Sequence, residues 1–308
     1  MMKKNNKIFK ILTILLISLT LCGCTKALTD ENKKPIEYEK TGKTITKNII
    51  CRPTDKNLIK IYEDNKVDIS KLPECKNMKI TGKYEDLWNS FFVRPLAFII
   101  IKVGELVKNT GLGLILVTVL IRLVLYPLTR KTALQSELIK QAQPELTKLE
   151  KKYEGKTDND SLTKKSQEMM MIYKKYNINP MSGCLFSFIQ LPLLFAFLEA
   201  INRVPAIFEG KFLTFEMGMT PLKAITSGDI KYIIICLAII GTTFLSFKMN
   251  SAATPETKGQ TKMMSTMMTI FIGIASFTYP TAIAIYWIAS SICTIGQNLI
   301  TDRRKKHE

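Results

Sequence analysis

The sequence predicts an all-α integral membrane protein with five transmembrane helices, and three observations lead to this prediction. Apolar residues make up 46% of the 308 residues and lie in long blocks instead of being spread along the chain. The formal net charge of +18 falls mainly between those blocks, which is typical of basic loops beside a membrane and argues against a specific nucleic-acid partner. The chain also begins with an export signal.

Residues 1–23 are predicted to be a lipoprotein signal peptide, because lysines precede an apolar stretch that ends in small residues. The ending Leu21-Cys22-Gly23-Cys24 resembles a bacterial lipobox, in which Cys24 is acylated, with palmitate for example, and becomes the new N-terminus. An uncleaved anchor is the alternative. Residues 24–87 are polar and rich in helix breakers, so we expect an extracytoplasmic tether with little core, in which segments 45–51 and 58–62 are candidate short strands.

The cysteines and the histidine restrict the chemistry that this chain can support. Cys51 and Cys75 lie in the exported part, where a disulfide is chemically permitted, although two free thiols fit the sequence equally well. The lone histidine, His307, lies in the tail, so the chain predicts no histidine-based metal site and no catalytic triad. A phosphate-binding loop of the form G-x-x-x-x-G-K-[ST] is also missing from the sequence. We therefore predict a protein that is not an enzyme and needs no cofactor.

The remaining elements follow from the alternation of apolar and charged segments. Residues 88–108 predict an amphipathic helix in the outer interface, because Lys102 and Glu105 interrupt its apolar face; a first transmembrane helix is the alternative. Residues 129–178 predict a cytosolic helical hairpin that is broken at Gly155 and capped at Ser161. The five predicted spans cover residues 111–128, 181–201, 232–247, 264–277 and 281–300. An extracytoplasmic loop (202–231), a cytosolic loop (248–262) and a basic cytosolic tail (301–308) complete the chain.

Two independent cues predict the same orientation in a bacterial plasma membrane. The export signal and the lipid anchor at Cys24 place the mature N-terminus outside, and five crossings then leave the C-terminus in the cytosol. The loops assigned to the cytosol by this count hold most of the Lys and Arg residues of the membrane part, as the positive-inside rule requires.

Arg122 is the one cation well inside the first predicted span. At ~1.5 Å per helical residue it lies roughly 16 Å from Gly111 and about 12 Å from Arg130, below the membrane surface on the cytosolic half. A guanidinium stays protonated and is costly to place in lipid, and the spans contain no acid at comparable depth. We therefore expect a hydrophilic groove that is open to the cytosol and holds Arg122.

Three further residues are candidates for lining this groove. Thr118 lies four residues before Arg122 and shares its helical face, while Gln190 and Trp287 come from other predicted spans. Each assignment has a structural alternative. Arg122 can extend to the inner interface, Gln190 can bridge two helices, and Trp287 can pack in the core or anchor in an interfacial aromatic belt.

Four runs resemble the YidC/Oxa-type membrane protein insertases, and the resemblance as a whole covers about residues 88–304. They are GLGLILVTVLIRLVLYPLTRKTALQS, QAQPELTKLEKKY, YKKYNINPMSGCLFSFIQLPLLFAF and YPTAIAIYWIASSICTIGQNLI. The lipoprotein start is similar to that of the five-span bacterial branch of the family.

The resemblance implies a chaperone-like insertase that inserts and helps fold nascent membrane proteins, either beside the Sec translocon or independently of it. It implies that Arg122 is the groove cation, with Thr118, Gln190 and Trp287 as neighbours. It also implies that the hairpin receives substrates and that the basic tail contacts the ribosome, although attraction to anionic lipids explains the tail equally well. A small-solute transporter or channel is the alternative function and requires paired ionisable residues along a complete path; an assembly scaffold requires no groove.

Overall fold

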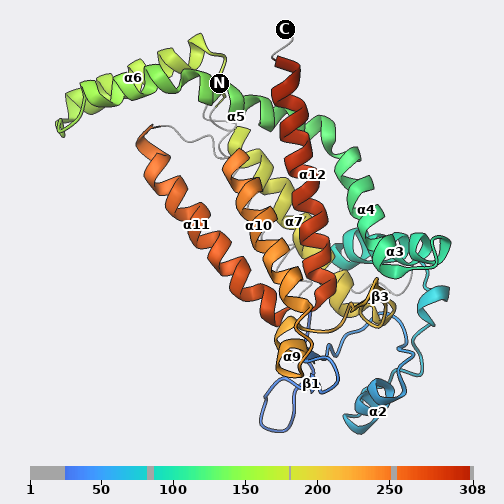
Figure 1. Ribbon diagram of the computed structural model, residues 1–308. Coiled ribbons are helices and arrows are strands. Elements are labelled where there is room, and N and C mark those ends of the chain that lie inside the picture. The colour runs from blue at the N-terminus through green and yellow to red at the C-terminus, as the bar shows by residue number, and fades with distance from the viewer. Residues whose placement is uncertain (1–24, 82–86, 180–181, 251–254, 306–308) are drawn as a thin grey trace. The chain divides into compact units, whose positions relative to one another are not determined.

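The structure, a computed structural model, describes residues 25–81, 87–179, 182–250 and 255–305 (Figure 1). The chain forms two compact units. The first unit comprises Met1–Thr118, Gln190–Leu237 and Ala275–Trp287, and the second comprises Val119–Ile189, Ala238–Ile274 and Ile288–Glu308.

Helices account for most of the described chain. In sequence order they are α2 (Lys56–Asp64), α3 (Arg94–Leu106), α4 (Thr110–Val124), α5 (Tyr126–Lys152), α6 (Asn159–Lys175), α7 (Ser182–Arg203), α8 (Pro205–Phe208), α9 (Pro221–Thr226), α10 (Tyr232–Asn250), α11 (Pro255–Thr278) and α12 (Thr281–Lys305). A 3-10 turn (η1, Cys75–Asn77) and a π-helical turn (η2, Asn89–Val93) precede α3. Two short antiparallel hairpins pair β1 (Glu37–Tyr38) with β2 (Lys43–Thr44), and β3 (Lys211–Phe212) with β4 (Phe215–Glu216).

Residues 25–81, here called the N-terminal domain, have an apolar core, so the expected tether with little core is wrong. The buried members are Leu28, Ile45, Ile49, Leu58, Tyr62, Ile69 and, from α8, Phe208. The candidate strand over residues 58–62 is also wrong, because this segment belongs to α2. The Asp55 carboxylate caps α2 by accepting hydrogen bonds from the backbone N–H groups of Asn57 (2.9 Å) and Leu58 (3.4 Å), which satisfies donors that a helix N-terminus leaves unpaired.

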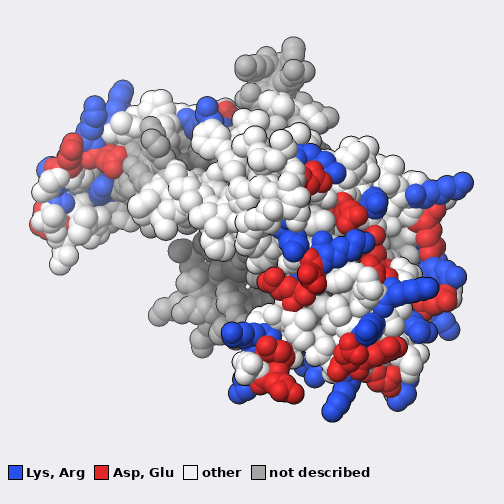
Figure 2. All heavy atoms as spheres, turned by 60° about the horizontal axis from the view of Figure 1, so that its bottom comes forward, with Lys and Arg blue, Asp and Glu red and all other residues white. Residues whose placement is uncertain are grey.

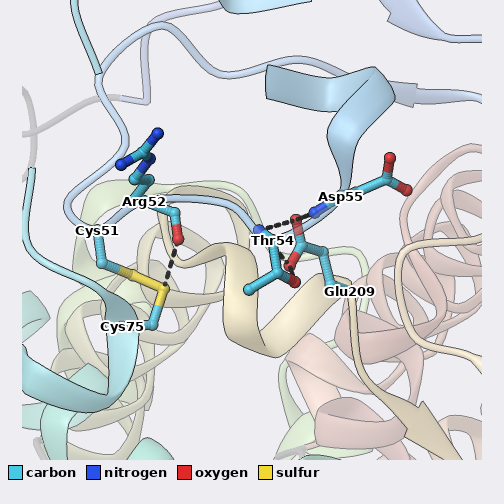
Figure 3. The surroundings of a disulfide bond; sticks show 6 residues. All are labelled: Cys51, Arg52, Thr54, Asp55, Cys75 and Glu209. Carbon is cyan, nitrogen blue, oxygen red and sulfur yellow. Dashed lines mark hydrogen bonds between the residues drawn. A yellow bond between two sulfur atoms is a disulfide. The ribbon is translucent and has the colours of Figure 1, made fainter. Parts of the chain in front are cut away.

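A disulfide joins Cys51 to Cys75, with their Cα atoms 4.9 Å apart (Figure 3). It closes a loop that contains α2, and the loop-closure relation for a separation of 24 residues predicts about 3.4 kcal/mol of stabilisation through the unfolded state. Next to it, the Glu209 carboxylate accepts hydrogen bonds from the backbone N–H groups of Thr54 (3.1 Å) and Asp55 (3.2 Å) and from the Thr54 hydroxyl (Figure 3). The N-terminal domain is thereby tied to the segment that follows α8.

The turn between β1 and β2 packs against the start of α9, and Figure 1 shows the two elements next to each other. The backbone N–H of Thr220 donates to the carbonyl of Thr41 at 2.8 Å, and the Thr220 hydroxyl donates to the same oxygen at 3.1 Å. Gly42 adopts a φ of 69°, and a Cβ atom there would lie 2.6 Å from the Thr220 hydroxyl oxygen. Only glycine fits this close approach.

Lys43 is buried in the first unit, with 4% of its surface exposed. Its ammonium group donates to the carbonyl oxygens of Thr44 (3.1 Å) and Asn202 (3.4 Å) and lies 4.2 Å from the centroid of the Phe208 ring. Burial disfavours the charged form and lowers the pKa of Lys43 to about 7.

We expect Lys43→Met to stabilise the protein below pH 7 and to stabilise it less as the pH rises. In the unfolded chain the lysine keeps a pKa near 10.5, so between about pH 7 and 10.5 the unfolded state binds more protons than the folded state. The free energy of unfolding of the wild type therefore rises with pH over this range. Methionine does not titrate, so the variant has no such increase. The measurement is the difference in thermal unfolding midpoint between Lys43→Met and wild type, at about pH 7 and at about pH 10.5. A difference that does not change with pH would contradict the prediction.

The described residues contain two helical segments that are long and apolar enough to cross a membrane, Tyr232–Met249 in α10 and Thr281–Thr301 in α12. The helices α4 and α5 make a third candidate if their 57° bend is counted within one broken span. Pro127 in the first turn of α5 accounts for the break, because its ring and its missing N–H cannot continue α4. The apolar part of α11, Ser265–Thr278, is shorter. The count of five spans stays a prediction.

The segment predicted as a helical hairpin contains α5 and α6, which contact each other in the second unit. Ala142, Leu146 and Ile178 form a small buried core with apolar side chains from both helices around it. The predicted cap at Ser161 is wrong: Asp158 is the cap, and its carboxylate accepts a hydrogen bond from the Ser161 N–H at 2.8 Å. A short carboxylate placed before the first turn reaches this donor directly.

Candidate functional site

Arg122 lies on α4, in a run of apolar residues, and its side chain is half-buried. Its guanidinium donates a hydrogen bond to the hydroxyl of Ser290 on α12. Both residues belong to the second unit. A guanidinium keeps its charge at any physiological pH, so a hydroxyl partner orients this cation and leaves its charge in place.

Ser290 begins a row of polar side chains along one face of α12, here called the α12 polar stripe. Its members are Ser290, Thr294, Gln297 and Thr301, which are spaced at helical intervals. The hydroxyls of Thr294 and Thr301 donate to the carbonyls four residues earlier, at 3.0 and 2.9 Å. The amide oxygen of Gln297 accepts a hydrogen bond from the hydroxyl of Thr129 on α5 at 3.1 Å. The stripe therefore meets α4 through Arg122 and α5 through Thr129.

The structure assigns the other three predicted groove residues to the first unit. Thr118 is buried, and its hydroxyl donates to the carbonyl of Leu114 at 2.7 Å within α4. Gln190 on α7 and Trp287 on α12 are half-buried. Arg122 is the only one of the four in the second unit, where its hydroxyl partner lies three residues after Trp287 on α12.

Sequence reasoning missed the α12 polar stripe, although a signal for it was present. Residues 290, 294, 297 and 301 are polar positions that recur at intervals of three and four, in a mainly apolar segment that also holds Ser291 and Asn298. Single hydroxyl residues are common in membrane helices, so only their shared face distinguishes the stripe. Among the described residues there is no group of three or more His, Cys, Asp or Glu side chains that could hold a metal ion.

The first unit contains a buried ion pair that the sequence analysis did not predict. Glu199 and Arg203 lie one turn apart near the end of α7, and the carboxylate is 3.4 Å from the guanidinium. Their side chains are only 8% and 1% exposed. The Arg203 guanidinium also donates to the carbonyl of Asn48 at 2.7 Å, and the Arg203 carbonyl accepts from the N–H of Ile50 at 3.0 Å. This pair attaches the N-terminal domain to α7.

A known family model matches the part of the chain that holds the cation and the polar stripe. The model of the 60Kd inner membrane protein family matches residues 102–308, which include Arg122 and every member of the stripe. The chain belongs to this family, the YidC/Oxa1 family. The N-terminal domain, with its disulfide, precedes the residues that the family model matches.

Relatives of this family member include two named insertases. The chain is 37% identical to "Membrane protein insertase YidC 2" of Bacillus anthracis over 222 residues. This alignment covers 72% of this chain and 83% of that protein. Over 232 residues it is 34% identical to "Membrane protein insertase MisCA" of Bacillus subtilis (strain 168), covering 74% and 85%. A solved structure, "Active YidC insertase crystal structure with the first transmembrane domain resolved", matches with a TM-score of 0.44 and 19% identity, covering 79% of this chain and 53% of that one.

Proposed function

We propose that this protein is a membrane protein insertase and chaperone whose substrates are nascent membrane proteins. The observation that supports this most strongly is a fixed cation among apolar helices, Arg122 held by Ser290, in a chain that belongs to the YidC/Oxa1 family. A cation at membrane depth is costly and is kept where polar or charged groups must be accommodated. The polar outer region of a membrane protein in transit is such a group.

In the proposed mechanism, Arg122 and the α12 polar stripe line a hydrated groove that opens to the cytosol, with Thr118, Gln190 and Trp287 as neighbours. The apolar segment of a client moves along the outside of the helices while its short polar or acidic region enters the groove. The cation and the hydroxyl groups lower the cost of that region at membrane depth. The apolar segment then partitions into lipid, gaining roughly 0.3 to 0.6 kcal/mol for each favourable residue, and no nucleotide is consumed.

The proposed topology places the protein in the bacterial plasma membrane as a five-span lipoprotein. Its N-terminus is extracytoplasmic and carries a lipid on Cys24, and its C-terminus is in the cytosol. Cys24 itself is not among the residues that the structure describes. The α5–α6 hairpin receives clients there. The basic tail, residues 301–308, contacts anionic lipids or the ribosome, and the protein acts beside the Sec translocon or without it.

Complementation tests this function directly. The full chain is produced in bacteria that are depleted of their own insertase, and the insertion of a small single-span client is scored by protease protection. We expect insertion to recover to a large fraction of the undepleted level. A chain that reaches the membrane in normal amount but leaves the client uninserted would contradict the proposal. Solute leakage through liposomes that contain the purified protein would instead favour a transporter or channel.

A further inference from the structure

A cleft of about 650 Å³ opens on the surface of the first unit, between the N-terminal domain and the junction of α3 with α4. Arg52, Glu74 and Lys76 line it on the N-terminal side. The other wall is formed by the last turn of α3, the connection that follows it and the first residue of α4, with Ile101, Gly104, Glu105, Lys108 and Thr110. The volume is that of a small-molecule site.

The charges in this cleft leave an excess of positive charge. Of its two acids, Glu105 pairs with Lys102 at 2.8 Å, and Glu74 pairs with Lys76 at 3.1 Å. Among the residues that the structure describes, no carboxylate lies within ion-pair distance of Arg52 or Lys108. Figure 3 shows the Arg52 guanidinium directed away from the disulfide and from the Glu209 carboxylate. Two unneutralised cations on opposite walls favour an anionic ligand.

The main chain is hydrogen-bonded at both of these residues, and their side chains are exposed. Lys108 adopts a left-handed conformation, with a φ of 54°, in the short connection between α3 and α4, and its N–H donates to the Glu105 carbonyl at 3.2 Å. The backbone N–H of Arg52 donates to the carbonyl of Pro73 at 2.8 Å, beside the disulfide at Cys51.

An exposed apolar surface begins at the same junction. Leu106, at the end of α3, is 82% exposed, and Leu112 and Leu116 follow on one face of α4, with 39% and 41% exposed. Figure 2 shows charges of both signs spread over the part of the first unit that carries α2, β1 and α9, so a free anion would find many other cations there. The cleft is cationic, and Leu106 and Leu112 lie within two residues of its lining residues Glu105 and Thr110 along the chain. This combination matches an amphiphile, with an anionic head and apolar chains.

We propose that this cleft binds an anionic phospholipid of the outer leaflet. Arg52 and Lys108 hold the phosphate of the headgroup, and the acyl chains lie against Leu106, Leu112 and Leu116. The inference rests on the proposed function for one point only, the outward position of the N-terminal domain. Bound lipid would fix that domain at the membrane surface, through contacts that the lipid on Cys24 does not supply.

The test measures the affinity of the full chain, in neutral detergent, for fluorescent phosphatidylglycerol and for the zwitterionic phosphatidylcholine. The cleft variant is Arg52→Gln with Lys108→Asn, since asparagine tolerates the left-handed backbone. The control is Lys34→Gln with Lys60→Gln, which removes the same charge from exposed positions outside the cleft. We expect the cleft variant to bind phosphatidylglycerol about thirtyfold more weakly, from two lost cations, and the control to match wild type.

Each of the other outcomes overturns the inference. Equal losses of phosphatidylglycerol affinity in the cleft variant and the control would show a general effect of charge. An unchanged affinity in the cleft variant would show that the lipid does not bind in this cleft. Displacement of the lipid by millimolar inorganic phosphate would show a phosphate site, and displacement by an acidic peptide would show a polypeptide site. If the cleft variant unfolds at lower temperature, the single variants Arg52→Gln and Lys108→Asn replace it, and each must weaken binding about fivefold. Insertion is scored separately, so failed insertion with intact lipid binding counts against the proposed function alone.

Discussion

Replacing Arg122 with alanine is expected to reduce insertion of a client with an acidic outer region about tenfold. An acidic residue at membrane depth costs roughly 2.5–3.5 kcal/mol, and a fixed cation that offsets about half of this cost accounts for a tenfold change in rate. A client whose outer region is polar but uncharged should lose much less. Protease protection of pulse-labelled clients in the complemented cells measures both effects.

Two further variants separate charge from geometry at this site. Arg122→Lys keeps the charge but loses the planar fork, so partial activity would show that charge is the main contribution. Ser290→Ala removes the hydroxyl that accepts from Arg122 and should weaken insertion less than the loss of the cation does. Arg130→Ala is the matched control, because it removes one positive charge at the predicted cytosolic end of the same span. Equal defects in Arg122→Ala and Arg130→Ala would contradict a specific role for Arg122.

Replacing Glu199 with leucine should destabilise the protein by about 3–5 kcal/mol, because it leaves the Arg203 guanidinium buried without its carboxylate. This is the largest effect on stability that we expect from a single substitution. Thermal unfolding in detergent, followed by circular dichroism, measures the loss. The N-terminal domain should loosen first, since Arg203 binds the carbonyl of Asn48, and protease cleavage within residues 25–81 should become faster.

A double variant distinguishes loss of the pair from loss of packing. Glu199→Leu with Arg203→Met removes both charges, so much of the lost stability should return. The exposed pair Asp68 and Lys71, with side chains 54% and 88% exposed, is the control, and Asp68→Ala should change stability by no more than about 1 kcal/mol. If the double variant is as unstable as Glu199→Leu, the buried ion pair is not the cause.

The sequence supported the membrane class because this inference needs only local information. A long apolar block must satisfy its backbone hydrogen bonds internally, so it is helical wherever it meets lipid. Arg122 was found for the same reason, since a cation in an apolar run is visible without any knowledge of the fold. Ser290 and Thr129 were not found, because their significance depends on which helices pack together, and α4 and α12 lie far apart in sequence.

The N-terminal domain shows where local reasoning fails. Its composition is polar and rich in breakers, which predicts little core, yet its apolar residues pack around α2 and against Phe208. The segment 58–62 has β-favouring residues but is helical, because the Asp55 cap and the burial of one face outweigh a weak intrinsic preference. Sequence spacing also left open whether Cys51 and Cys75 are joined, since a disulfide depends on a distance between parts of the fold.

The sequence by itself was enough to predict the family, the helical membrane class and the cation Arg122. Hydrophobicity, charge and motif spacing are properties of short segments, so they can be read without the fold. Contacts between distant segments required the folded chain: the Ser290 hydroxyl that accepts from Arg122, the bond from Thr129 to Gln297 of the α12 polar stripe, the bond from Arg203 to the carbonyl of Asn48, and the cleft lined by Arg52 and Lys108. The physical reason is that each of these joins groups from separate helices or loops. Their energies depend on distance and burial, which arise only when the chain has packed.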